Sequence, residues 1–104
     1  MKDVVPRELA NRDGEEAIEH YLVETTAKLA LGFIDELEKV YHHIARHPSS
    51  GSPRYAHHLG LADPRFWRLG RYPCLVFYAE REEHMDACRV LHEQRDIPRW
   101  MNEA

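Results

Sequence analysis

The longest regular pattern of apolar residues lies in the first half of the chain. Apolar side chains recur there at intervals of three and four, as along one face of an amphipathic helix: Ala30, Phe33, Ile34, Leu37, Val40, Tyr41 and Ile44. Thr25 and Thr26 are suited to cap the start of this helix. Pro48 forces its end near Arg46 or His47, because the residue before a proline is pushed out of the helical conformation.

A shorter helical pattern comes before it, formed by Ala17, Ile18, Tyr21 and Leu22. Asp13 and Glu16 have the spacing of a capping box, and both acids favour the positive end of a helix. We therefore predict a first helix from about Gly14 to Glu24. The link to the second helix is so short that the two should fold back as an antiparallel hairpin.

Short runs of β-branched and aromatic residues in the second half predict strands. Three such runs are Phe66 to Leu69, Cys74 to Tyr78 and Met85 to Leu91. They should pair as an antiparallel meander, because parallel pairing would need a connection of about a dozen residues or more. Val4, Val5 and Pro6 fit the end of a short edge strand, and the sequence leaves open whether that strand forms.

Together these elements predict an α+β fold, in which an N-terminal antiparallel helix hairpin packs on one face of a three- to four-stranded antiparallel β-sheet. The apolar face of the second helix should point toward Leu75 to Tyr78, the predicted central strand. With 104 residues, of which 43% are hydrophobic, the chain is expected to form a single domain over residues 1–104.

Charge and cysteine content narrow the function classes. The formal net charge is -4 and basic residues form no run, so direct nucleic-acid binding is not expected. No stretch approaches the roughly 20 apolar residues of a membrane span and the start lacks a signal-peptide pattern, so we expect a cytoplasmic protein without membrane contact. Cys74 and Cys88 fall in predicted strands and should be buried, reduced thiols.

Histidine and arginine side chains are the candidate functional groups. His92, Arg68 and Arg89 are the residue types that metal-free RNA cleavage needs, namely a group for proton transfer and cations for the phosphorane charge. The alternative is that the arginines of the loop and sheet half hold the carboxylates of an acidic partner. This second set comprises Arg54, Arg68, Arg71, Arg89, His92 and Arg95. Trp100 either packs on the core or adds to the contact.

The eight histidines raise the question of a metal site. His43 and His47 have the i, i+4 spacing at which two histidines can share a zinc ion, but no third ligand is placed beside them. We therefore expect neither a metal nor another cofactor.

In this order of elements the sequence resembles the ParE/RelE superfamily of toxins from type II toxin–antitoxin modules, and within it the ParE branch of plasmid stabilisation proteins. The residues that carry the resemblance are Tyr21, Ala30, Phe33, Leu37, Ile44, Pro48, Gly51, Pro53, Arg54, Phe66, Trp67, Arg68, Tyr72, Pro73, Val76 to Tyr78, Arg89 to His92, Arg95 and Asp96. The resemblance implies a toxin that a cognate ParD-like antitoxin neutralises. ParE-like members are described as DNA gyrase inhibitors, whereas RelE-like members cleave messenger RNA on the ribosome.

Charge favours the ParE-like activity. RelE-type nucleases look like basic proteins that bind to ribosomal RNA. A chain with a net charge of -4 lacks the positive charge for that contact. We therefore expect a toxin that inhibits DNA gyrase by binding it, without chemistry of its own, and a homodimer is compatible with this expectation. Two alternatives remain: a ribosome-dependent endoribonuclease that uses His92 with Arg68 and Arg89, and a non-toxic remnant that still binds antitoxin.

Overall fold

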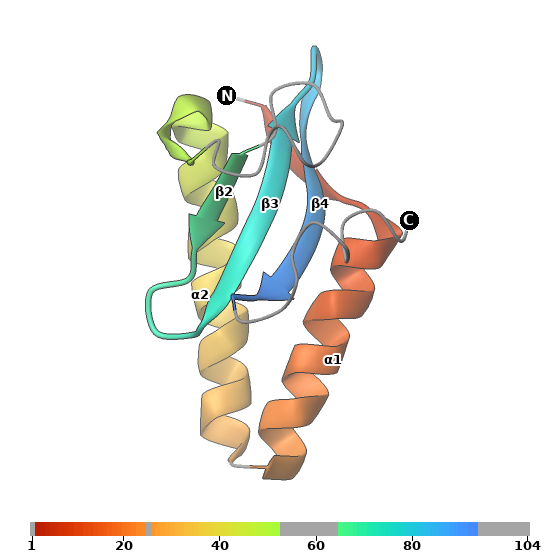
Figure 1. The fold of residues 1–104 in the computed structure, drawn as a ribbon, viewed down its shortest axis with the longest axis vertical. Helices are drawn as coiled ribbons and strands as arrows, with labels where there is room; N and C mark the ends of the chain where they lie inside the picture. The colour runs from red at the N-terminus through yellow and green to blue at the C-terminus, as the bar shows by residue number, and fades with distance from the viewer. Residues whose placement is uncertain (1, 25, 53–64, 94–104) are drawn as a thin grey trace.

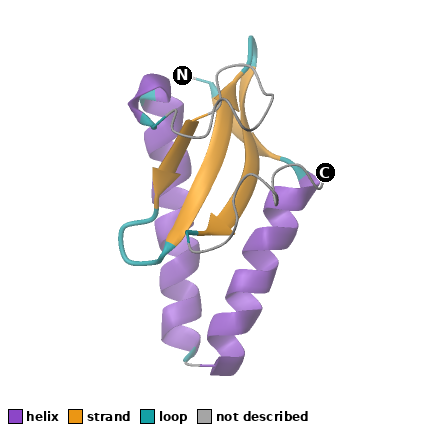
Figure 2. Cartoon of the chain, in the orientation of Figure 1, coloured by secondary structure: helices purple, strands orange, loops and turns teal. Residues whose placement is uncertain are grey.

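Two antiparallel helices lie behind a four-stranded sheet (Figure 1). The computed structural model describes residues 2–24, 26–52 and 65–93. Figure 2 shows both helices on the same side of the sheet, so the fold has two layers. The elements in chain order are β1 (Asp3–Pro6), α1 (Glu8–Glu24), α2 (Ala27–Arg46), η1 (Pro48–Ser50), β2 (Arg65–Arg68), β3 (Cys74–Glu80) and β4 (His84–His92).

The predicted α+β architecture and meander are confirmed, and the sheet carries one additional pairing. Its strand order is β1-β4-β3-β2, and β2, β3 and β4 pair antiparallel. The edge strand that the sequence left open at Val4 and Val5 does form, but it pairs with β4 in parallel. The sheet is therefore mixed rather than wholly antiparallel, and the long path from β1 to β4 supplies the connection that parallel pairing requires.

The start of α1 was predicted wrongly. The helix begins at Glu8, not near Gly14, and the Asn11 amide already donates to the Arg7 carbonyl oxygen at 3.0 Å. Asp13 therefore lies inside the helix and does not cap it, and its carboxylate instead accepts hydrogen bonds from β4. The capping-box interpretation considered only the local spacing, whereas the carboxylate has a partner far away in the sequence.

The second helix agrees with its prediction. It runs over Ala27–Arg46, and the Thr26 hydroxyl oxygen accepts a hydrogen bond from the Leu29 amide at 3.3 Å. Pro48 then opens the short 3-10 helix η1, because proline fits the first position of a helical turn but cannot continue α2.

The core lies between the helices and one face of the sheet. Phe33 and Ile44 of α2 are fully buried in one cluster with Val76 and Tyr78 of β3, which confirms the predicted contact. Side chains alternate along a strand, so Phe77 points to the opposite face, where it contacts Phe66 at a ring-centroid distance of 5.6 Å.

Three aromatic rings fix the hairpin to the turn between β2 and β3. Tyr72 packs edge-on against both Tyr21 of α1 and Phe33 of α2, with centroid distances of 5.2 and 5.5 Å. Its hydroxyl donates to the Leu29 carbonyl oxygen at 2.7 Å. Both helices are therefore tied to the sheet near their linked ends. Cys74 and Cys88 are buried and are not joined in a disulfide, as expected.

Candidate functional site

A groove of about 650 Å³ runs between α2 and the edge strand β2. Apolar side chains form much of its wall, and exposed charged side chains stand at its rim. Its lining residues are Glu36, Lys39, Val40, His43, Ser50, Ser52, Phe66, Trp67, Arg68 and Gly70. This combination of an apolar wall with a few polar groups is typical of binding sites in proteins.

The wall of the groove is a stacked pair of rings from two elements. Trp67 of β2 lies against His43 of α2, with centroids 4.2 Å apart and an interplanar angle of 31°. Trp67 points to the helices because it pairs with Val76, whose side chain faces the core. The stack therefore links α2 to the edge strand along the groove.

The orientation of His43 is set by η1. Its Nε2 lies 3.0 Å from the Ser50 hydroxyl oxygen, and that hydroxyl donates to the His47 carbonyl oxygen at 2.7 Å. A hydroxyl has one proton to donate, so with His47 as its acceptor Ser50 accepts from His43, which places a proton on Nε2. This hydrogen bond fixes the tautomer of the His43 ring. The centroid of that ring lies 5.2 Å from the centroid of the His47 ring.

The segment that follows η1 is held to the sheet by Tyr78. The Tyr78 hydroxyl donates to the Pro48 carbonyl oxygen and accepts from the Gly51 amide, both at 2.9 Å. A Cβ atom at position 51 would overlap this hydroxyl and lie 2.8 Å from the Phe66 carbonyl oxygen, so the close approach requires glycine. Ser50 and Ser52, which line the groove, are fixed on either side of this contact.

Among the described residues, one part of the β2 edge is paired and the next part is not. Ser52 and Phe66 exchange two backbone hydrogen bonds of 2.9 Å on the side of β2 that faces away from β3. In an antiparallel ladder alternate residues point the same way, so the Arg68 amide and carbonyl also face outward. No described residue pairs with these two Arg68 backbone groups, and they lie beside the groove.

Arg68 and Arg71 are exposed, as a docking role requires. The Arg68 guanidinium bonds the Glu93 carboxylate at 2.9 Å and the Leu69 carbonyl oxygen at 3.1 Å. An ion pair this exposed contributes little to stability, because water screens both charges. Arg68 is therefore able to exchange Glu93 for the carboxylate of another molecule at low cost.

Arg89 differs from Arg68 and Arg71, because it is buried. Its guanidinium holds the Asp13 carboxylate through two hydrogen bonds of 2.8 and 2.9 Å, and the two side chains are only 8% and 9% exposed. The same carboxylate accepts from the Val90 amide at 3.0 Å. The pairing of β4 with β1 ends at Ala87, and beyond it the Asp13 carboxylate accepts from the backbone of β4. Arg89 neutralises the charge of this carboxylate.

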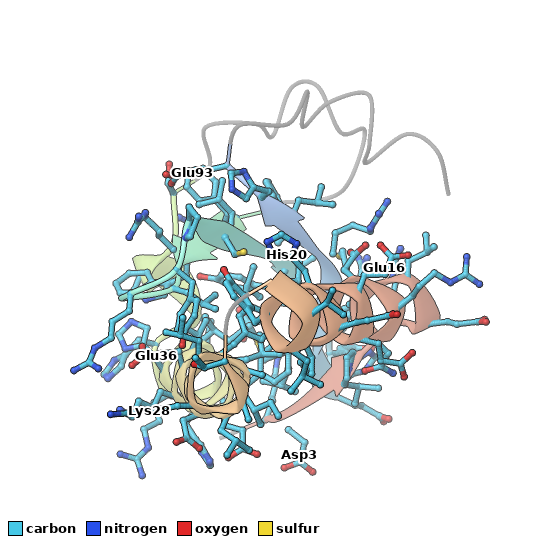
Figure 3. All side chains as sticks on the ribbon, turned by 90° about the horizontal axis from the view of Figure 1, so that it is seen from below. Asp3, Glu16, His20, Lys28, Glu36 and Glu93 are labelled. Carbon is cyan, nitrogen blue, oxygen red and sulfur yellow. The ribbon has the colours of Figure 1, made fainter. Side chains whose placement is uncertain are left out.

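His92 lies in a second, smaller pocket of about 310 Å³ between α1 and the end of β4. Its lining residues are Asp13, Glu16, Ala17, His20, Tyr21, Cys74, Val90, Leu91 and His92. Figure 3 shows His20 on the side of α1 that faces the sheet. Arg68 is on β2, two strands away from β4, so the structure does not gather His92, Arg68 and Arg89 in one pocket.

The remaining predicted site residues, Arg54, Arg95 and Trp100, lie outside the described residues. Within the described ranges, histidine, cysteine and carboxylate side chains do not gather in threes where a metal ion could bind. Neither α1 nor α2 combines the length and apolar character of a membrane-spanning helix.

Sequence reasoning missed the residues that shape the groove. Ser50 and Ser52 were not among the predicted site residues, and His43 was considered only as a metal ligand. The available signals were Trp67 in a predicted strand and the earlier Pro-Ser-Ser-Gly-Ser turn at residues 48–52. Those signals do not show which edge the turn will cover.

Burial shifts the acid–base behaviour of two side chains near the core. It raises the pKa of Tyr41 to about 12, with the nearby Asp13 charge acting in the same direction. Burial also raises the pKa of the Cys88 thiol, and the negative charge of Asp86 adds to that effect. At neutral pH the Cys88 sulfur therefore stays protonated and weakly nucleophilic.

A second ion pair closes the corner between β1 and α1. Arg7 donates from Nε and Nη2 to the Asp86 carboxylate at 3.0 and 2.7 Å, and these bonds raise the pKa of Arg7. The Arg7–Asp86 and Asp13–Arg89 pairs together fix β4 to the N-terminal half at two points.

The fold and its edge groove define a class of small α+β proteins in which a helix hairpin backs a mixed sheet. A family model described as the ParE toxin of a type II toxin–antitoxin system, parDE, matches residues 4–97. The chain therefore belongs to the ParE toxin family of type II toxin–antitoxin systems.

A solved structure shares this fold. It is described as the chromosomal ParDE toxin–antitoxin system from P. aeruginosa, and it superposes with a TM-score of 0.72 at 16% sequence identity. The match covers 88% of this chain and 96% of the other chain. A search among curated proteins finds no match.

Proposed function

We propose that the chain is the toxin of a type II toxin–antitoxin pair, that it arrests growth by binding DNA gyrase, and that a cognate ParD-like antitoxin neutralises it. Membership of the ParE toxin family supports the first part. The observation that carries the choice of binding over chemistry is the burial of Arg89 against Asp13.

Metal-free RNA cleavage needs cations that can reach the scissile phosphate. Arg89 is committed to Asp13 inside the protein, and freeing it would leave a buried carboxylate without its counter-charge. His92 is half-buried on the other side of β3 from Arg68. These placements, with the net charge of -4, favour a toxin that binds a protein over one that cleaves messenger RNA on the ribosome.

Induced expression in growing cells tests the target. We expect the supercoiling of a reporter plasmid to fall before amino-acid incorporation does. A fall in protein synthesis that comes first would instead support the ribosome-dependent nuclease. Normal growth under full expression, with antitoxin binding retained, would identify a non-toxic remnant.

We also propose where the antitoxin binds, namely in the groove between α2 and β2. An extended antitoxin segment would pair antiparallel with the Arg68 backbone groups, which have no partner among the described residues and follow the Ser52–Phe66 pair along this edge. Trp67 and His43 would contact its apolar side chains. Its carboxylates would meet Arg68 and Lys39, both exposed at the rim.

Two substitutions at one position separate the side-chain and backbone contributions of this edge. Arg68→Gln removes the charge and should weaken antitoxin affinity about tenfold, which corresponds to roughly 1.4 kcal/mol. Arg68→Pro also removes the outward amide but leaves the β2–β3 ladder bonds, so it should weaken affinity further. Arg46→Gln, at an exposed arginine outside the groove, is the matched control. Equal affinities for all four proteins would place the antitoxin elsewhere.

A further inference from the structure

One acid lies among the cations of the groove between α2 and β2. Of the described residues that line this groove, Glu36 is the only carboxylate, whereas Lys39 and Arg68 are cations. Glu36 belongs to α2, and Figure 3 shows it on the side of this helix that faces away from α1. A segment that is acidic throughout would therefore meet repulsion at this point of the groove.

The Glu36 carboxylate is shielded from water but has few partners. Its side chain is 18% exposed, and its charged contact is Lys39, with the nitrogen and oxygen atoms 3.6 Å apart. Lys39 is itself 73% exposed, so this pair contributes little to stability and opens easily. No described residue donates a hydrogen bond to the carboxylate. Its oxygens therefore have capacity for a donor from another molecule.

The carboxylate lies against the turn that follows β2. A Cβ atom at position 70 would lie 3.1 Å from Oε2 of Glu36, so Gly70 leaves the space that the carboxylate occupies. Arg68 comes two residues earlier, at the end of β2. Glu36 therefore marks the Gly70 end of the groove, and the Trp67–His43 stack lies on the other side of Arg68.

Strand geometry gives the order of side chains in a paired segment. A segment antiparallel to β2 begins at the Gly70 end, and its successive side chains alternate between the two faces of the sheet. The residue opposite Arg68 shares the outer face with the Arg68 side chain, because Trp67 points to the helices. Both of its neighbours face α2. The residue before it lies at the Glu36 end, and the residue after it lies at the Trp67–His43 stack.

We propose that Glu36 receives a lysine or arginine side chain of the antitoxin, and that the segment in the groove has the order basic, acidic, apolar. The basic residue neutralises Glu36, the acidic residue pairs with Arg68, and the apolar residue covers the Trp67–His43 stack. This inference rests on the proposed antitoxin site and adds the residue that selects the partner. Lys39 does not replace the basic residue, because on turning to an antitoxin carboxylate it leaves Glu36 covered and without a counter-charge.

The test reverses this one charge in the full chain, as Glu36→Lys. Lysine is a good helix former, so α2 should be retained. The probe is the purified ParD-like protein encoded beside the chain, and its affinity should fall at least about tenfold. Glu38→Lys is the matched control, because Glu38 is an exposed acid of the same helix outside the groove. The control changes the net charge equally and should bind no more weakly than the unmodified chain.

A compensating change identifies the partner residue. Each lysine and arginine in the part of the antitoxin that binds the toxin is changed to glutamate in turn. We expect one such change to weaken binding to the unmodified chain at least about tenfold and to restore binding to the Glu36→Lys variant. Thermal unfolding of the variants should match that of the unmodified chain. Glu36→Gln keeps the shape of the side chain, so it tests the charge if Glu36→Lys unfolds more easily, and it should weaken binding as well.

The outcomes separate this inference from the antitoxin site on which it rests. If Arg68→Gln weakens binding but Glu36→Lys binds as tightly as Glu38→Lys, the antitoxin lies in the groove and the inference is wrong. A loss at Glu36 that no antitoxin substitution restores would also overturn it, because the carboxylate would then act within the toxin. If neither Arg68→Gln nor Glu36→Lys changes the affinity, or if the ParD-like protein does not bind, the proposed site fails and the inference fails with it.

Discussion

At the scale of single residues, the Asp13 carboxylate is both a counter-charge and a hydrogen-bond acceptor for β4. It neutralises Arg89 and accepts the Val90 amide, so it joins α1 to the edge of β4. Removing one member of a buried ion pair strands the other charge, which is more costly than the pair itself is stabilising.

We therefore predict that Asp13→Ala lowers the free energy of unfolding by about 3–5 kcal/mol in urea titrations. The double variant Asp13→Leu with Arg89→Met should regain most of that loss, because it removes both charges from the interior. Asp35→Ala, at an exposed aspartate of α2, is the control. A loss below about 1 kcal/mol for Asp13→Ala would mean that water reaches Arg89.

Tyr41 makes the stability of the fold sensitive to alkaline pH. Its pKa is raised from 10.0 to about 12 by burial, so the unfolded chain loses this proton at lower pH than the folded protein. Between these two values the unfolded state binds fewer protons, and the free energy of unfolding must fall as pH rises.

Tyr41→Phe should flatten that fall by up to roughly 3 kcal/mol between pH 10 and 12, measured by denaturant unfolding at each pH. Tyr21→Phe is the comparison, because the pKa of Tyr21 is raised as well but its side chain is less buried. Below pH 9 the variants should show no difference in slope. An unchanged alkaline slope in Tyr41→Phe would assign the effect to another group.

At the scale of elements, η1 depends on one tyrosine of β3. Tyr78→Phe leaves the buried Gly51 amide without its acceptor and the Pro48 carbonyl oxygen without its donor. We expect a loss of roughly 1–3 kcal/mol in unfolding free energy and faster hydrogen exchange at Gly51. Antitoxin affinity should fall too, because η1 carries one wall of the groove. Tyr72→Phe removes a hydroxyl bond at the other end of α2, so it should leave exchange at Gly51 unchanged.

The elements that local patterns specify were the ones that could be predicted. α2 has a capping threonine, a long apolar face and a terminating proline, and it was placed within two residues at each end. The meander strands were found because short apolar runs separated by turns permit few other arrangements. The start of α1 was missed because the helix begins at Glu8, directly after β1, and the local pattern does not show the β1–β4 pairing that fixes this position.

The site was less predictable than the fold, because arginine side chains in two strands lie in different surroundings. Arg68 and Arg89 both lie in strands, yet one is exposed beside Glu93 and the other is buried against Asp13. That difference depends on α1 lying along β4, which the sequence pattern does not specify. The groove depends in the same way on Ser52 reaching the edge of β2.

At the scale of the whole molecule, the groove beside β2 is the proposed antitoxin site. It combines the Arg68 backbone groups, which no described residue pairs with, and cationic side chains, and this combination suits an extended acidic segment.

The central claim is that toxicity comes from binding DNA gyrase and not from cleaving RNA. The most direct test is gyrase-catalysed supercoiling with purified components, in which the unmodified chain is compared with His92→Ala. We predict that both proteins inhibit supercoiling with equal potency and that neither cleaves messenger RNA on ribosomes. Undisturbed supercoiling together with messenger RNA cleavage that His92→Ala abolishes would contradict the account.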